Sequence, residues 1–211
     1  MMGYKISGYC VIRNFSIWVN HERCIQSSTT SLEEFLVAAY TQINMNYPRY
    51  YKMDSLSKVG ILAAELLWRD AKIIRPDSPE SIAVILSNAH ASLDTDVRYW
   101  ESAKKQASPA LFVYTLPNIV TGEICIRHNL KGENAFFIAE RFDPVLLSDY
   151  AGMVLDQPGT KLCMGGWLDV MNDHHDVFLY LMEKSEDGNS AEEIRATLNT
   201  IYQLDYGKIN S

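Results

Sequence analysis

"LKGENAFFIAERFD", residues 130–143, is the stretch that decides the fold class. A glycine turn at Lys131-Gly132 leads into a short apolar run, Ala135 to Ala139, which ends at the charged pair Glu140-Arg141. The aromatic and β-branched residues of this run have high strand propensity and supply apolar area on both faces, so the run predicts a strand. A helix is predicted directly after it, over residues 143–156. A strand that leads straight into a helix is typical of α/β folds.

The same alternation of strand and helix signals continues on both sides of this stretch. Apolar spacing of three and four residues indicates helices, and capping boxes at Ser31 with Glu34 and at Ser190 with Glu193 mark two of their starts. Strands are expected at 4–12, 81–89, 134–139, 160–166 and 176–183, and helices at 31–43, 55–70, 94–106, 143–156 and 190–204, with a polar loop over 14–30 and a helix in the second half of 109–128. The pattern predicts a single α/β domain over residues 1–211.

Composition and charge narrow the classes of function. A length of 211 residues suits one domain with a sizeable core. A net charge of −7 argues against nucleic acid or an anionic membrane as a general partner, because both are bound through clustered lysine and arginine. The N-terminus lacks a long apolar core and no segment is apolar enough to span a bilayer, so we expect a cytoplasmic protein.

Cysteines and histidines offer no metal or cofactor site in the sequence. Cys10, Cys24, Cys125 and Cys163 are scattered singly, which favours reduced and mostly buried thiols over a disulfide framework. His174-His175 lies between two aspartates, but adjacent residues point in different directions and no third ligand follows at a useful spacing. We therefore expect a solvated turn there, with no metal and no cofactor.

Four segments of the chain, in the right order, resemble β-ketoacyl synthases. Residues 4–12 are similar to the opening strand of the family, and residues 50–67 resemble the helix that the synthases open with a Met-Asp pair. Residues 108–138 resemble the stretch that leads into the nucleophile strand, and residues 159–169 the strand and double-glycine turn that follow the nucleophile helix. The residues that carry the resemblance are Met53, Asp54, Pro117, Asn118, Gly122, Gly132, Gly165 and Gly166.

The resemblance covers nearly the whole chain but only the N-terminal half of a full synthase. It implies a thiolase-like half domain, with a mixed five-stranded sheet covered by helices. The glycines also have packing interpretations that are compatible with the family. Gly122 would allow close approach of a helix, and Gly132 and Gly165-Gly166 would form turns that need positive φ.

The family's catalytic cysteine has no counterpart at the expected position. Counting from Gly132 without a gap places Arg141 there, and one residue of slippage gives Glu140 or Phe142. A thiolate is needed because the acyl group is held covalently while the second substrate is decarboxylated, and neither arginine nor glutamate serves that step. The two catalytic histidines of the family lie in its C-terminal half, so His174 and His175 do not take their roles.

Three hypotheses for function follow from the resemblance. The first is a non-catalytic, chain-length-factor-like protein that associates with a synthase or an acyl carrier protein in fatty-acid or polyketide-type synthesis, with aryl-polyene pigments as one such pathway. The second is an active acyltransferase, a 3-oxoacyl-acyl-carrier-protein synthase with a non-standard nucleophile, for which Asp143 or Cys163 would be the candidates. The third is a structural thiolase-like domain without acyl chemistry.

The resemblance also assigns a role to the strand Ala135, Phe136, Phe137, Ile138 and Ala139. In the family the nucleophile strand pairs with its counterpart across a two-fold axis, which joins two sheets into one. We therefore expect this strand to form either a homodimer or a heterodimer with a full β-ketoacyl synthase. The alternative is an interior strand of a monomer, which Glu140-Arg141 merely ends.

Overall fold

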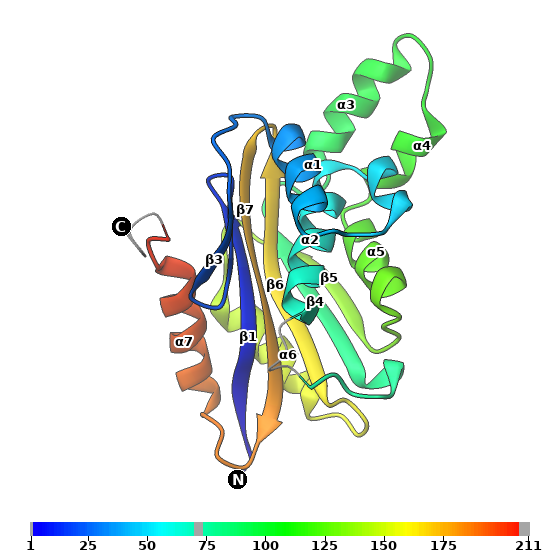
Figure 1. The fold of residues 1–211 in the computed structure, drawn as a ribbon. Coiled ribbons are helices and arrows are strands. Elements are labelled where there is room, and N and C mark those ends of the chain that lie inside the picture. Colours follow the sequence, from blue (N-terminus) through cyan, green and yellow to red (C-terminus); the bar gives the residue numbers. More distant parts are fainter. Residues whose placement is uncertain (1, 70–73, 207–211) are drawn as a thin grey trace.

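A computed structural model describes residues 2–69 and 74–206 of the chain. Its centre is one seven-stranded mixed sheet with the strand order β3-β2-β1-β7-β6-β4-β5 (Figure 1). Strands β4, β5 and β6 run parallel to one another, and the remaining neighbours pair antiparallel. The strands are β1 (Gly3–Arg13), β2 (Ser16–Val19), β3 (Glu22–Gln26), β4 (Ile82–Asn88), β5 (Asn134–Ile138), β6 (Leu162–Met171) and β7 (His174–Ser185).

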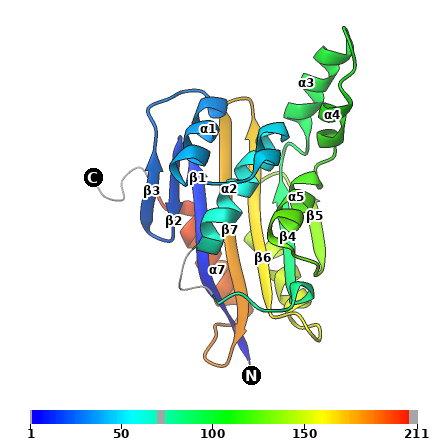
Figure 2. The ribbon, with the colours of Figure 1, turned by 45° about the vertical axis from the view of Figure 1, so that its right-hand side comes forward.

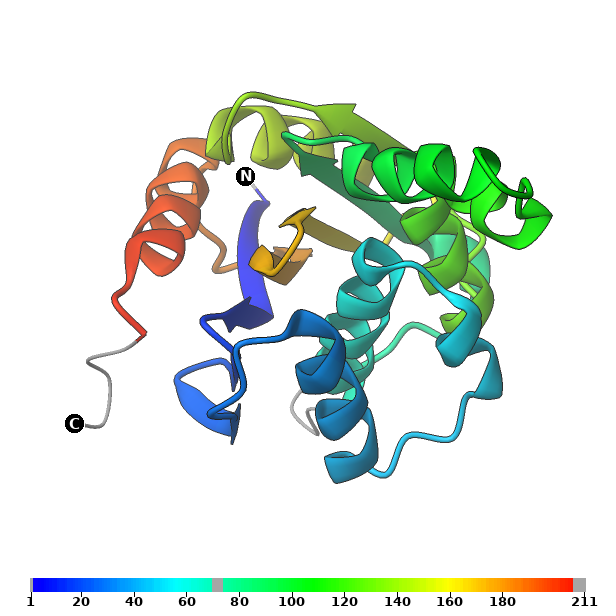
Figure 3. The same cartoon turned by 90° about the horizontal axis from the view of Figure 1, so that it is seen from above.

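Helices cover both faces of this sheet (Figures 2 and 3). The helices are α1 (Leu32–Gln42), α2 (Ser55–Arg69), α3 (Leu93–Ala103), α4 (Pro109–Phe112), α5 (Ile119–His128), α6 (Pro144–Leu155) and α7 (Ala191–Gln203), with short 3-10 turns η1 (Pro48–Lys52), η2 (Pro79–Ser81) and η3 (Val113–Thr115). Helices α1, α2 and α5 enclose one apolar cluster, and α6 and α7 enclose a second on the opposite face. All of β4 is buried between these layers, as its continuous apolar run predicts.

The α/β class and all five expected strands are confirmed, but the sheet has seven strands. The two additional strands, β2 and β3, occupy the segment expected to be a polar loop. Only Ile17, Trp18 and Ile25 of this segment are buried, so its apolar signal is weak. The β1–β2 turn places Asn14 and Phe15 at φ 48° and 54°. Asn-Phe lacks the glycine that usually announces such a hairpin turn, which is why the sequence pattern did not indicate it.

The predicted helices agree with the structure over the described residues, and residue 70, the predicted end of the helix 55–70, lies outside them. Ser190 accepts the Glu193 N–H and the Glu193 carboxylate accepts the Ser190 N–H, which completes the predicted capping box of α7. Ser31 caps α1 through the Glu34 N–H, but the Glu34 side chain accepts from Thr29 instead of closing the box. Within residues 2–69 and 74–206, no single helix is long and apolar enough to cross a membrane. Residues 109–115 and 119–128 reach that threshold only as a pair bent by 101°.

Candidate functional site

The candidate site lies where the parallel strands β4, β5 and β6 end at the same edge of the sheet. Carboxyl ends of parallel strands are the usual position of functional loops in α/β proteins. The loops after β4 and β5 are joined directly, because the Ala139 N–H donates to the Asn88 carbonyl at 2.9 Å. This contact places Glu140-Arg141 beside the segment Ala89-His90.

The loop after β5 presents two charged side chains over a broad depression. Glu140 and Arg141 are exposed, and with Asn199 and Gln203 of α7 they line a hollow of about 580 Å³. Phe142 turns inward and stacks on the Tyr202 ring at a centroid distance of 4.1 Å. The two residues expected at the nucleophile position are therefore a solvent-facing charged pair on an anchored loop.

None of the other candidate nucleophiles is activated. Cys163 is fully buried on β6, and burial raises its pKa to about 12. Burial likewise raises the pKa of Cys125, on α5, to about 11. Asp143 is the N-cap of α6 and accepts the N–H groups of Val145 and Leu146 at 2.9 and 3.0 Å. Thiolate chemistry would require a thiol that ionises near neutrality, and these two thiols do not.

A histidine and an aspartate that the sequence pattern did not single out meet at this edge. The buried Asp169 of β6 accepts from His90 Nδ1 at 2.8 Å and from the N–H groups of Ala89 and His90. Asn88 bonds both the N–H and the carbonyl of Ala91, which has a positive φ of 51°. The loop is thus held in a conformation that an alanine rarely adopts. Because His90 and Asp169 are far apart in sequence, no spacing indicated their contact.

Two of the motif residues act structurally. Asp54 is buried at the start of α2, where it accepts the Ser57 N–H at 2.9 Å and the Thr95 hydroxyl of α3 at 2.8 Å. Burial raises the pKa of this carboxyl. Met53 is buried in the core, and Pro117-Asn118 lead into α5. Asp54 therefore ties the start of α2 to α3.

The predicted roles of the motif glycines were wrong in detail. A Cβ at Gly122 would meet nothing, so Gly122 does not serve close helix packing; Gly60 of α2 does, facing Val120 of α5. Gly132 does not have positive φ, but a Cβ there would collide with the Ile82 carbonyl. Gly165 and Gly166 lie inside β6 rather than in a turn, under the Tyr180 ring and Leu179 of β7. Gly132, Gly165 and Gly166 are thus required for space and not for backbone conformation.

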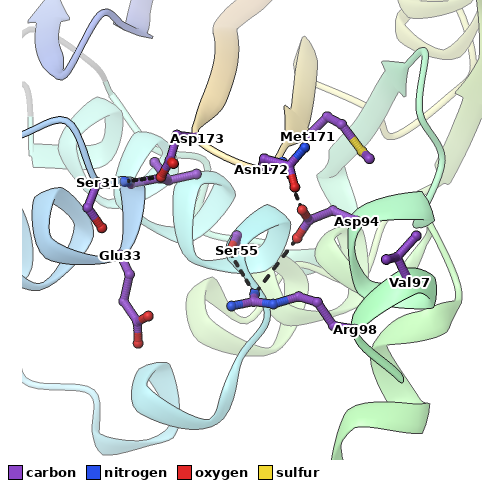
Figure 4. A pocket seen from close by; sticks show the side chains of 10 residues that line it. Ser31, Glu33, Ser55, Asp94, Val97, Arg98, Met171, Asn172 and Asp173 are labelled. Atoms are coloured by element: carbon purple, nitrogen blue, oxygen red, sulfur yellow. Dashed lines mark hydrogen bonds and ion pairs between the residues drawn. The ribbon is translucent and has the colours of Figure 1, made fainter. Parts of the chain in front are cut away.

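The expected solvated turn at His174-His175 was also wrong, since both residues belong to β7. His175 is buried against the rings of Phe15 and Phe35, and burial lowers its pKa. The turn itself is Asn172-Asp173, and it borders a pocket of about 240 Å³ (Figure 4).

In this pocket Asp173 accepts the Leu32 N–H and Asp94 accepts the Asn172 N–H, both at 2.8 Å, while Arg98 points toward Asp94 and Ser55 (Figure 4). Asp94, Arg98 and Asp173 thus satisfy one another or the backbone. No cluster of metal-ligating side chains occurs in the described residues.

Strand β5 forms one edge of the sheet, so the alternative of an interior strand is wrong. Ala135, Phe137 and Ala139 pack against the cluster on the α6 side, and Phe136 packs against the opposite cluster. Ile138 is 55% exposed, as are Ile126 of α5 at 60% and Met153 of α6 at 51%. An unpaired strand edge flanked by exposed apolar side chains is a surface suited to pairing with another chain.

No family model and no curated protein matches the sequence, but solved structures match the fold. The ishigamide ketosynthase/chain length factor aligns with a TM-score of 0.67 and 16% identity over 89% of this chain and 64% of that chain. A ketosynthase in complex with its chain length factor from Xenorhabdus doucetiae gives 0.56 and 11% identity, over 94% of this chain and 92% of that one. A β-ketoacyl synthase from Burkholderia phymatum gives 0.60 and 11% identity, over 88% and 60%.

The fold is therefore the thiolase-like α/β fold of ketosynthases and chain length factors. The chain spans 64% of the length of the ishigamide protein and 60% of the Burkholderia synthase.

Proposed function

We propose that this chain is a non-catalytic β-ketoacyl-synthase-like subunit of the chain-length-factor type, acting in the cytoplasm in fatty-acid or polyketide-type synthesis. The observation that carries the proposal is a ketosynthase-like fold in which Glu140-Arg141, and no cysteine, follow strand β5. The resemblance places the nucleophile of the synthases at this point, which supports a non-catalytic role. Two of the similar structures contain chain length factors, which supports this class of function. Synthesis of aryl-polyene pigments is one such pathway.

In this proposal residues 1–211 form one domain that works by association. The free edge of β5 pairs with a second chain of the ketosynthase fold, which is either another copy or a full β-ketoacyl synthase. An acyl carrier protein is the second partner. No step of acyl chemistry is assigned to this chain, and it needs no cofactor.

The competing function is an acyltransferase with a non-standard nucleophile, and catalytic assays separate the two. We expect no decarboxylation of malonyl thioesters by the wild type or by Arg141→Cys. A thiol alone does not restore the reaction, because the members of a catalytic set act together and not additively. Intact mass after incubation with an acyl carrier protein thioester should remain unchanged. Turnover by the wild-type chain, or a covalent acyl adduct, would overturn the non-catalytic proposal.

The association itself is tested by charges placed on the β5 edge. Phe137→Asp or Ile138→Asp would bury an unpaired charge in a paired strand and should shift the chain to monomer or aggregate in sedimentation. Ile74→Asp is the matched control, because Ile74 is 90% exposed and lies outside β5. If both β5 variants sediment as the same soluble species as the wild type, β5 does not mediate pairing. Absence of binding to both a ketosynthase and a carrier protein would favour a purely structural domain.

A further inference from the structure

A hollow lies on the hairpin of β2 and β3, at the edge of the sheet opposite to β5 (Figure 1). It has a volume of about 330 Å³ and is bordered by the β1–β2 turn, by both strands of the hairpin and by the segment after α7. Its polar lining includes Arg13, Asn14, Ser16, Arg23 and Gln26. The pairing proposed for β5 does not involve this hollow.

A β-bulge directs Arg23 into this hollow. Ile17 of β2 pairs with Ile25 of β3. The next residue, Trp18, pairs with Arg23, which leaves Cys24 as an additional residue in β3. In a regular strand Arg23 would share a face with Ile25, which packs in the cluster on the α1 side. The bulge instead turns Arg23 toward Trp18, which belongs to the cluster on the α7 side, and the guanidinium carbon lies 5.3 Å from the centre of the Trp18 ring.

Arg13 is held on the same face of the sheet by three contacts. Its Nε donates to Asp176 at 2.5 Å, and its Nη1 donates to the Tyr202 carbonyl at 2.6 Å. Its guanidinium carbon also lies 4.2 Å from the centre of the Tyr202 ring. The remaining nitrogen, Nη2, has no hydrogen-bond partner in the described part of the chain. Arg13 is therefore a preorganised side chain with one donor group left for a ligand.

The other donors around the hollow are also without protein partners. Arg23 is exposed, and it makes no hydrogen bond or ion pair with residues 2–69 or 74–206. The side chains of Asn14 and Gln26 are exposed as well, and they form no hydrogen bond within the same ranges. Asp205, the acid that lines the hollow, is engaged in an interaction of its own. Two guanidinium groups and two amides thus border the hollow with N–H groups that the described protein does not use.

An oxyanion is the class of ligand that these donors fit. Guanidinium groups donate in planar forks that match the oxygens of a carboxylate or a phosphate, and hydrogen bonds to a charged acceptor are stronger than those to a neutral one. Arg13 is already balanced by Asp176, so Arg23 supplies the positive charge that attracts the anion. A volume of about 330 Å³ is that of a site for a small molecule.

We infer that this hollow binds the carboxylate or phosphate group of a small molecule, with Arg23 as the residue that captures the anion and Arg13 as a fixed second donor. The site goes beyond the proposed function, because it lies at the opposite edge of the sheet from β5. Loss of the site should therefore leave association through β5 unchanged, and loss of that association should leave the site unchanged.

NMR titrations of the full chain with inorganic phosphate and, separately, with acetate test the site at low ionic strength, where screening is weak. We expect saturable shifts of the backbone amide signals of Ser16, Arg23 and Gln26. Arg23→Gln should weaken binding at least about tenfold, because it removes charge-assisted hydrogen bonds. Arg23→Lys keeps the charge but lacks the planar fork, so its affinity should fall between the two. Lys161→Gln is the matched control, because it removes the same charge at an exposed residue that does not line the hollow.

Each outcome decides the inference. Saturation by phosphate alone assigns a phosphate group, saturation by acetate alone assigns a carboxylate, and either result supports the site, as does saturation by both. Absence of saturable shifts with both anions overturns it. The inference also fails if Arg23→Gln binds as the wild type does, or if Lys161→Gln weakens binding to the same extent, since attraction would then follow the net charge. Amide signals of Arg23→Gln outside the hollow should match those of the wild type, which shows that the fold is kept.

Discussion

Asp54→Ala should destabilise the protein through two separate losses at one buried carboxylate. Asp54 is 6% exposed, and it both caps α2 and accepts the hydroxyl of Thr95, which is itself 2% exposed. Loss of an N-cap costs about 1 kcal/mol. A buried hydroxyl left without a partner costs about 1–3 kcal/mol more. We therefore expect the free energy of unfolding to fall by about 2–4 kcal/mol.

The assay is urea denaturation of wild type, Asp54→Ala, Thr95→Val and the double variant. In the double variant no buried hydroxyl is orphaned, so its loss should be smaller than the sum of the single losses by about 1–2 kcal/mol. Ser55→Ala, at the partly exposed residue next to the cap, is the control and should change stability little. Additive losses from Asp54→Ala and Thr95→Val would refute the idea that their hydrogen bond fixes α2 against α3.

Two further predictions concern the glycines and pH. Gly165→Ala should lower the free energy of unfolding by about 1–3 kcal/mol, because the added methyl group would collide with the Tyr180 ring. Gly122→Ala should raise it by up to about 1 kcal/mol, because the new side chain meets no neighbour and favours the helix. Thermal denaturation that shows a change of the same sign for both variants would contradict the packing argument. His128 is buried, and burial lowers its pKa to about 4. The free energy of unfolding should therefore fall by up to about 3 kcal/mol as pH drops from about 6.5 to 4, because only the unfolded chain gains the proton in this range. In denaturation experiments at several pH values, His128→Asn should make the free energy of unfolding depend less on pH.

The sequence by itself determined the local elements, and it predicts that Glu140 or Arg141 stands where the synthases have a cysteine. Apolar spacing and capping residues predicted α1, α2, α6 and α7, and the apolar runs predicted β4 and β5. These signals are local, because a helix or strand repeats its buried positions within a few residues. Four short segments in order were enough to predict the thiolase-like fold, which the solved structures confirm.

The tertiary structure decided everything that depends on which distant segments meet. His90 and Asp169 are 79 residues apart, and only the parallel pairing of β4 with β6 brings them together. His175 is polar by sequence but buried, because two phenylalanines from other elements cover it. Whether β5 lies at an edge or inside the sheet is set by strand order, which its own residues do not encode. Periodicity specifies how a segment presents its side chains, whereas the neighbours that meet them are chosen by the packing of the whole chain.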